Sequence, residues 1–139
     1  MNSFGINKVT LLGRLGCDPR VRHSASGDLR VYITLATNEQ WHDNSTSAIK
    51  CRTEWHEVVF FGQPAEVAEA FLKKGTCICI EGQIRNHSWK DQSGQLLRRT
   101  EIIVARRGAL QIVNLSIRRG APEQESATTE SSPPDCSDF

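Results

Sequence analysis

The chain has 139 residues, which is room for one domain with a hydrophobic core. All 17 lysines and arginines fall in residues 1–119 beside 11 acids, whereas residues 120–139 hold five acids and no lysine or arginine. A basic body with an acidic end indicates an anionic partner for the body and a separate role for the end. No apolar run has the length of a membrane span, and the first residues lack a signal-peptide run, so the sequence predicts a cytoplasmic protein without a membrane partner.

The first third of the chain has the pattern of β-strands. Apolar and β-branched residues alternate with polar ones over residues 8–15 and 29–41, and a short strand is expected between them over residues 20–23. Gly13 interrupts the first strand, which predicts a bulge or a close backbone approach where that strand bends. Residues 42–50 are polar and rich in Asn, Ser and Thr, so they are expected to form a loop.

The next strand ends at Gly62 and has no cleanly polar face. Side chains alternate across a strand, so Trp55 and Phe61 share one face, while Val58 and Phe60 share the other. A strand that only covered a core would have one apolar and one polar face. We therefore expect the face with Trp55 and Phe61 to be a stacking platform for nucleic-acid bases.

One helix is expected in the chain, over residues 63–75. Pro64 suits its first turn, Gly75 can end it, and the helical period turns Val67, Phe71 and Leu72 inward. Three strands are expected after the helix, over residues 77–89, 95–104 and 110–115. A hairpin turn at residues 91–94 joins the first two of them. Beyond them Ser, Thr, Glu and Pro dominate, which predicts a disordered acidic tail over residues 116–139.

The order of these elements predicts the fold class. Three strands, one helix and two further long strands are typical of the OB-fold, a five-stranded Greek-key barrel, here with its helix between strands 3 and 4. The expected class is therefore all-β with one helix, and the OB-fold domain should cover residues 3–115. OB-folds bind oligonucleotides or oligosaccharides on their strand face and loops, so the fold narrows the function without settling it.

Aromatic and basic residues interleave along the predicted strands. Trp41, Trp55 and Trp89 lie at strand ends or on faces that the core does not need. An aromatic ring can stack on any base, and lysine and arginine attract the phosphate backbone without sequence preference. The basic residues near the tryptophans are Lys50, Arg52, Arg85, Lys90, Arg98 and Arg99. This mixture favours a protein that binds single-stranded nucleic acid.

Other functions stay open on these residues. The same aromatics could pack in a core or against a partner protein, which would make the chain an interaction adaptor, and an OB module for RNA or primosome assembly is a second alternative. The sequence contains neither a Gly-x-x-x-x-Gly-Lys phosphate loop nor a Gly-x-Ser-x-Gly elbow, and its cysteines and histidines lack zinc-site spacing. We therefore expect no enzyme activity, no metal and no cofactor, although converging carboxylates could build a metal-dependent nuclease.

Several segments match a known family in the right order along residues 5–115. They include Ile33-Thr34-Leu35-Ala36-Thr37, Thr53-Glu54-Trp55-His56, Ile80-Glu81-Gly82-Gln83 and Trp89-x-Asp91-Gln92-Ser93-Gly94. On these segments the chain resembles the bacterial-type single-stranded DNA-binding protein (SSB) family. The resemblance implies binding of single-stranded DNA without strong sequence preference, which protects the DNA during replication, recombination and repair.

The resemblance also implies roles for single residues. The base-stacking aromatics would be Trp41, Trp55, Phe61 and Trp89. Contacts to the DNA backbone would come from Arg22, Lys50, Lys73, Lys74 and Arg85, and we expect Arg98 to join them. The family is typically a homotetramer, and His56 matches a position at a subunit contact. Family members also dock onto replication and repair proteins through an acidic tip, which corresponds here to Asp135, Asp138 and Phe139.

The chain departs from the family pattern in three places. Glu57 stands where a basic residue usually follows the strand histidine, and His87 and Ser88 replace a basic pair before Trp89. We therefore expect a lower and more salt-sensitive affinity for DNA than in a typical member. The tail lacks a long Gly- and Gln-rich linker and a proline before Phe139, which argues against docking of the usual partners.

Overall fold

The computed structural model describes residues 4–113 of the chain. Its elements in this range are β1 (Val9–Leu15), β2 (Arg20–His23), β3 (Leu29–His42), β4 (Ile49–Phe61), α1 (Gly62–Phe71), β5 (Cys77–Lys90), β6 (Leu96–Val104) and β7 (Leu110–Ile112). The predicted order of strands around one helix is confirmed. The predicted domain limits at residues 3 and 115, and the predicted tail, lie outside the described residues and stay predictions.

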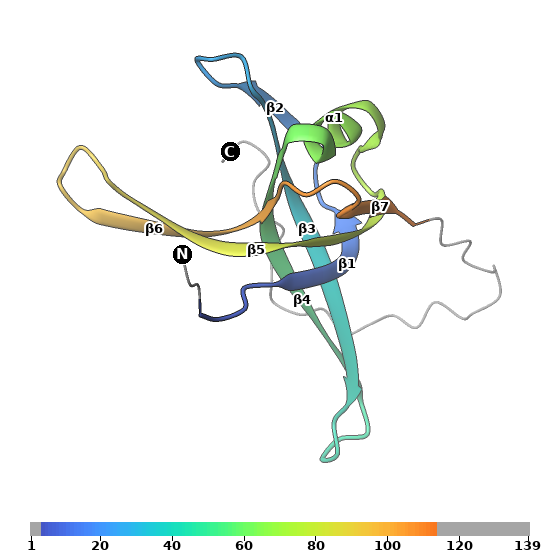
Figure 1. Ribbon diagram of the computed structural model, residues 1–139. Helices are drawn as coiled ribbons and strands as arrows, with labels where there is room; N and C mark the ends of the chain where they lie inside the picture. Colours follow the sequence, from blue (N-terminus) through green and yellow to red (C-terminus); the bar gives the residue numbers. More distant parts are fainter. Residues whose placement is uncertain (1–3, 114–139) are drawn as a thin grey trace.

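Five of the strands close into a small barrel (Figure 1). β1, β3, β4, β6 and β5 are neighbours in that order, and β5 pairs back with β1 to complete the ring. β4 and β6 pair in parallel, whereas the other barrel pairs are antiparallel. The helix follows the third barrel strand, β4, and the short strands β2 and β7 add to β3 and β5. The predicted OB-fold is therefore confirmed.

Two glycines let strands of the barrel approach each other closely. A Cβ atom on Gly13 would collide with the carbonyl oxygen of Ala36, and one on Gly82 would collide with the carbonyl oxygen of Ile103. At the same place β1 changes partner, since residues 9–14 pair with β5 and residues 14 and 15 pair with β3. The predicted close approach at Gly13 is confirmed, because only a residue without a side chain fits there.

The core fills the barrel and extends under α1. The strands supply its larger members, which are Leu15, Val31, Ile33, Leu35, Val58, Phe60, Ile78, Ile80, Ile102 and Val104. Phe60 is fully buried, and burying a side chain of this kind stabilises a fold by about 1.5–3 kcal/mol. β4 therefore turns Val58 and Phe60 toward the core and keeps Trp55 and Phe61 on its other face.

The helix α1 is shorter than predicted and packs through different side chains. It ends at Phe71, and its buried residues are Pro64, Ala65 and Ala68. Leu72 is buried directly after the helix, which confirms that prediction, whereas Phe71 is 66% exposed, so the prediction that Phe71 faces inward is wrong. The reason is that the buried side of the helix carries the small residues Ala65 and Ala68, which let the helix lie close to β3 and β4. The larger ring of Phe71 then points toward solvent.

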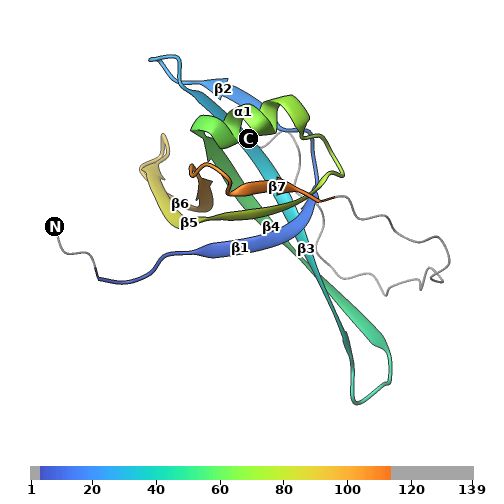
Figure 2. The ribbon, with the colours of Figure 1, turned by 45° about the vertical axis from the view of Figure 1, so that its right-hand side comes forward.

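Two hairpins extend beyond the barrel (Figures 1 and 2). The far ends of β3 and β4 form one arm, and those of β5 and β6 form the other. In the second arm the Asp91 carboxylate accepts hydrogen bonds from the backbone N–H groups of Ser93 (2.9 Å) and Gln95 (2.8 Å). The predicted hairpin turn at residues 91–94 is thus confirmed. Within residues 4–113, no helix has the length and apolar character needed to cross a membrane.

Candidate nucleic-acid interface

One face of the sheet, opposite to the core, carries rings and charges together. On β3 and β4 it consists of the cross-strand pairs Trp55–Ala36, Glu57–Thr34, Val59–Tyr32 and Phe61–Arg30. Pairing of Val59 with Ile103, and of Ile103 with Gln83, continues the face onto β6 and β5. There it includes Leu97, Arg99, Glu101, Ile103, Gln83, Arg85, His87 and Trp89. We call this surface the outer face. Its central members Thr34, Val59 and Ile103 are buried, but none of its residues belongs to the cluster that fills the barrel.

Trp55 is fixed at one end of the outer face. Its ring lies so close to Gly16 that a Cβ atom on this glycine would collide with the ring edge. Trp55 Nε1 and Thr34 Oγ1 are buried and have no hydrogen-bond partner in the described part of the chain. The ring itself is half-buried. The backbone at Gly16, directly after β1, therefore packs against the edge of the Trp55 ring, while part of Trp55 stays accessible.

Two more rings on the outer face have guanidinium groups above them. The guanidinium carbon of Arg30 lies 5.3 Å from the ring centre of Phe61, and that of Arg22 lies 6.0 Å from the ring centre of Tyr32. Both distances are in the range of cation–π contacts. The sequence analysis missed Tyr32 and Arg30, although alternation along β3 could have found them, since their neighbours in sequence face the core.

Trp89 extends the outer face along the second arm. Trp89 is 38% exposed, and its ring stacks on His87 at 5.6 Å between ring centres and lies 5.8 Å from the guanidinium carbon of Arg99. Arg98 pairs with Ser88, so it lies on the opposite side of this arm. The arginine that the structure brings to Trp89 is therefore Arg99 rather than Arg98.

Trp41 lies on the first arm, away from the outer face. It is 42% exposed, and the guanidinium carbon of Arg52 lies 5.8 Å from its ring centre. Its cross-strand partner is Lys50, whose Nζ forms an ion pair of 2.8 Å with the Asp43 carboxylate. That bond, together with hydrogen bonds from Ser45, holds the pKa of Asp43 well below its ordinary range. By strand alternation Trp41 is on the side of the arm opposite to Trp55.

Lys73 and Lys74 follow α1 in the loop that leads to β5. The backbone N–H of Lys74 donates to the Asp18 carboxylate at 2.8 Å. In the same loop the N–H of Gly75 donates to the carbonyl oxygen of Leu15 at 2.9 Å, and Arg14 donates to the carbonyl oxygen of Gly75 at 3.0 Å. These bonds attach the loop to the end of β1, one residue before the glycine that contacts Trp55.

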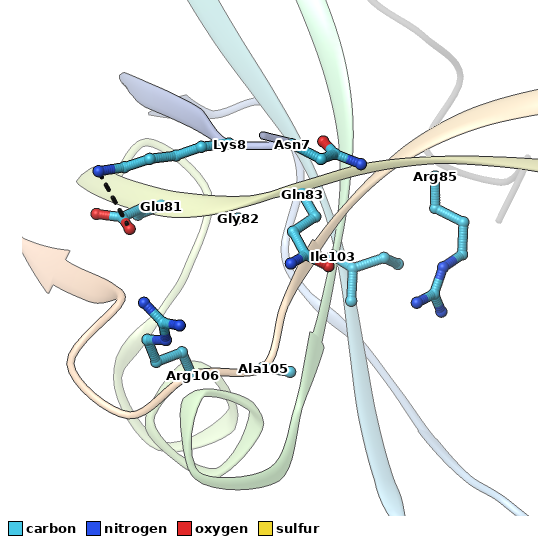
Figure 3. Close-up of a pocket in the computed structure, with 9 residues that line it drawn as sticks. All are labelled: Asn7, Lys8, Glu81, Gly82, Gln83, Arg85, Ile103, Ala105 and Arg106. Carbon is cyan, nitrogen blue, oxygen red and sulfur yellow. Dashed lines mark ion pairs between the residues drawn. The ribbon is translucent and has the colours of Figure 1, made fainter. Parts of the chain in front are cut away.

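A polar pocket of about 570 Å³ adjoins the outer face at Gln83 and Arg85. Figure 3 shows Lys8 and Arg106 around Glu81 at one end of this pocket and Arg85 at the other. The Lys8 Nζ and a Glu81 carboxylate oxygen are 3.6 Å apart. The pocket thus adds Lys8 and Arg106 to the positive groups beside the outer face. Of the three basic residues that line it, only Arg85 is in the predicted set.

A carboxylate lies within the outer face. Glu57 Oε2 is 3.1 Å from Arg99 Nε, and both side chains are about one-third exposed. Burial raises the pKa of Glu57, and this effect outweighs the lowering by the adjacent Arg99, with Glu101 adding to the rise. The positive charge of Arg99 therefore offsets only part of the cost of burying the Glu57 carboxylate.

His56 lies on the other face of β4. Its Nε2 is 2.9 Å from Thr37 Oγ1, and burial lowers its pKa against a smaller opposing effect of Glu54. The histidine is thus favoured in its neutral form. The predicted tip residues Asp135, Asp138 and Phe139 lie outside the described residues.

The outer face is suited to flat anionic ligands. Its rings can stack on planar groups, and the arginines beside them can bind negative charges. No group of three or more His, Cys, Asp or Glu side chains is arranged to hold a metal ion within residues 4–113.

Comparisons with known proteins agree with this description. The model of the single-strand binding protein family matches residues 6–112. Among solved structures, the chain is similar to the Plasmodium falciparum SSB in complex with ssDNA, at 32% identity and a TM-score of 0.74, covering 82% of this chain and 100% of that one.

A second structure shares the fold at lower identity. It is a deletion mutant of the single-stranded DNA binding protein from Thermus aquaticus, at 22% identity and a TM-score of 0.68, covering 81% of this chain and 52% of that one. The family match begins just before β1 and ends with β7, so it takes in the whole barrel and its outer face. Because the family match and the similarity to the Plasmodium falciparum SSB both cover most of the chain, this chain belongs to the single-strand binding protein family.

Proposed function

We propose that this chain binds single-stranded DNA on its outer face, with little dependence on base sequence, and protects it during replication, recombination and repair. The observation that carries the proposal is the repeated pairing of an accessible ring with a guanidinium group, at Phe61, Tyr32 and Trp89. A single strand exposes the flat faces of its bases next to its phosphates, whereas a duplex hides those faces. Rings beside arginines therefore fit the single strand better.

The basic groups around the outer face indicate where the phosphates would run. Lys73 and Lys74 lie near the Trp55 end, and the pocket with Arg85 lies beside the second arm. Lys50 would contribute at Trp41 on the first arm, although Asp43 neutralises part of its charge. Each lysine or arginine that contacts a phosphate adds affinity that falls with salt.

We also propose that the chain works as a homotetramer in the bacterial cytoplasm, and that its acidic tip docks onto replication and repair proteins despite the departures of the tail from the family pattern. Family membership supports the first point, and the half-buried face around His56 gives a second subunit a place to pack. Light scattering should then give a particle mass of about four times the 15.5 kDa of one chain. A mass of one chain at micromolar concentration would contradict the tetramer.

The binding proposal is tested by the fluorescence anisotropy of a labelled oligo(dT) strand, with unlabelled competitors. We expect unlabelled single-stranded DNA to displace the label and duplex of the same length to fail. The logarithm of the affinity should fall with the logarithm of the salt concentration by about 0.7 for each phosphate contact. Stronger competition by oligo(rU) than by oligo(dT) would favour an RNA-binding module instead, and an unchanged anisotropy would favour a protein adaptor.

A further inference from the structure

The outer face continues from β3 onto the short strand β2, at the end of β3 that lies opposite to the first arm (Figure 1). Arg20 pairs with Tyr32, and Arg22 pairs with Arg30. Directly paired residues point to the same side of a sheet, so both arginines of β2 lie on the side that carries Tyr32. We call Arg20, Arg22 and Arg30 the arginine cluster. Of these, only Arg22 belongs to the DNA contacts predicted from the sequence.

Two rings lie among these arginines. The partner of Arg30 on β4 is Phe61, and the guanidinium carbon of Arg30 is 5.3 Å from the centre of that ring. The guanidinium carbon of Arg22 is 6.0 Å from the centre of the Tyr32 ring. Both rings are half-buried, whereas both of these arginines are exposed. A base can stack on a guanidinium plane as well as on an aromatic ring, so the two ring–guanidinium pairs form one stacking surface that carries positive charge.

The arginine cluster suits an anion better than it suits the fold. Arg22 and Arg30 are directly opposite each other, and like charges in such positions destabilise a sheet. The rings offset part of this repulsion, although cation–π attraction is weak at exposed sites. A phosphate bound between the guanidinium groups would offset more, because each guanidinium presents paired N–H donors that match phosphate oxygens.

The middle of the outer face is less favourable to phosphates. Arg99, which lies beside Trp89, forms an ion pair of 3.1 Å with Glu57, and Glu101 repels the same carboxylate. These two carboxylates also repel the phosphates of a single strand. At the β2 end, by contrast, the cross-strand positions around Tyr32 and Phe61 hold arginines. The two ends of the outer face therefore differ in charge.

We propose that the arginine cluster is the main phosphate-binding part of the outer face, and that Tyr32 stacks on a base there as an additional member of the platform. The inference deepens the proposed function and rests on it. It locates the strongest contact with the strand at the β2 end. It also predicts that these arginines supply a large share of the salt dependence of binding.

Tyr32 is the only tyrosine in the chain, so it can be observed by itself. In protein made with 3-fluorotyrosine, fluorine NMR gives one signal, from residue 32. We expect this signal to shift as oligo(dT) is added, because a stacked base changes the magnetic surroundings of the ring. The shift should saturate together with the anisotropy of the labelled strand, and duplex of equal length should leave the signal in place.

Two substitutions at Tyr32 separate stacking from packing. Tyr32→Phe keeps the ring and should change the affinity for oligo(dT) by less than about twofold, whereas Tyr32→Leu keeps only apolar bulk and should lower it about fivefold or more, a figure from other proteins of this class. Equal affinities of the two variants would contradict stacking on this ring.

Arg30→Gln tests the phosphate contact, with Arg98→Gln as the matched control. Arg98 is an exposed arginine on the opposite side of the second arm. We expect Arg30→Gln to weaken oligo(dT) binding about tenfold at low salt and to reduce the logarithmic salt slope by about 0.7. Arg98→Gln should cost less than about threefold and leave the slope unchanged.

The outcomes separate this inference from the function on which it rests. A fluorine signal that stays in place while the anisotropy saturates, or equal losses for Arg30→Gln and Arg98→Gln, would overturn the inference and leave the proposed function standing. The fluorine measurement uses the unsubstituted chain, so it does not depend on the folding of any variant. Failure of that chain to bind oligo(dT) at all would overturn both.

Discussion

At the scale of single residues, the recurring unit is a ring with an arginine beside it. It occurs at Phe61, Tyr32 and Trp89 on the outer face, and at Trp41 on the first arm. Such contacts are worth only about 0.5–1 kcal/mol at exposed sites, so they do little for the stability of the fold. Their larger effect is to hold a positive charge next to the ring on which a base would stack, where it can attract the phosphates of the same strand.

Replacement of single arginines on the second arm tests this unit. Arg99→Ala should weaken binding of single-stranded DNA about tenfold at low salt, because it removes the charge beside Trp89 and leaves Glu57 unpaired. Arg98→Ala is the matched control, since Arg98 is the adjacent arginine on the opposite side of β6. We expect less than about a threefold loss for it. Equal losses for the two variants in a titration would contradict the assignment of the outer face.

The stability of the fold should depend on pH through His56. Burial lowers the pKa of this histidine in the folded state, so the unfolded chain binds its proton more tightly. The free energy of unfolding should therefore fall as the pH drops from about 7.5 to about 6, through the ordinary histidine pKa. His56→Gln keeps a polar group near Thr37 and removes the titration. If denaturant unfolding of this variant kept the full wild-type slope with pH, another group would be responsible.

The sequence located most of the aromatic residues but not their neighbours. Trp55 and Phe61 follow from alternation along one strand, and the resemblance to the family gave the full predicted set of four rings. Which arginine lies next to Trp89 depends on the register between β5 and β6, and that register is set by the barrel rather than by local sequence. For the same reason the sequence shows that Glu57 departs from the family pattern but cannot show its ion pair with Arg99, which depends on the packing of β4 beside β6.

At the scale of elements, the helix shows how packing overrides a local pattern. The helical period favours Phe71 as an inward residue, yet the helix contacts the barrel through Ala65 and Ala68. Small residues bring the helix axis nearer to β3 and β4, and this close approach decides which stripe is buried. The sequence predicts the positions of the strands more accurately than the buried side of the helix. Each strand has its own alternation of apolar and polar residues and is bounded by turn residues.

Two adjacent substitutions at the end of α1 test this packing. Leu72→Ala should lower the free energy of unfolding by about 2–4 kcal/mol, because it leaves a cavity under the helix. Phe71→Ala removes a larger side chain but should change stability by less than about 0.5 kcal/mol, because that ring is on the surface. Both are measured by denaturant unfolding at one protein concentration. A larger cost at Phe71 than at Leu72 would mean that the ring is covered, for example by another subunit.

At the scale of the whole molecule, the closed barrel carries two strand-paired arms that extend beyond it (Figure 2). Trp55 and Phe61 lie on the barrel strand β4, whereas Trp41 and Trp89 lie near the far ends of β3 and β5, in the two arms. This arrangement spreads stacking positions over a wide surface, as binding of an extended strand requires. In proteins of this class each stacked base is worth about 1–3 kcal/mol, a figure from such proteins and not from this chain.

The most direct measurement of the central claim is the intrinsic tryptophan fluorescence of the protein during titration with oligo(dT). Stacking of bases on Trp41, Trp55 and Trp89 predicts strong, saturating quenching with the single strand and almost none with duplex of equal length. Replacing each tryptophan by phenylalanine in turn should remove part of the quenching, which identifies the rings that meet bases. Emission that stays unchanged at saturating oligo(dT) would contradict the account, because the tryptophans would then be covered by protein and unavailable to DNA.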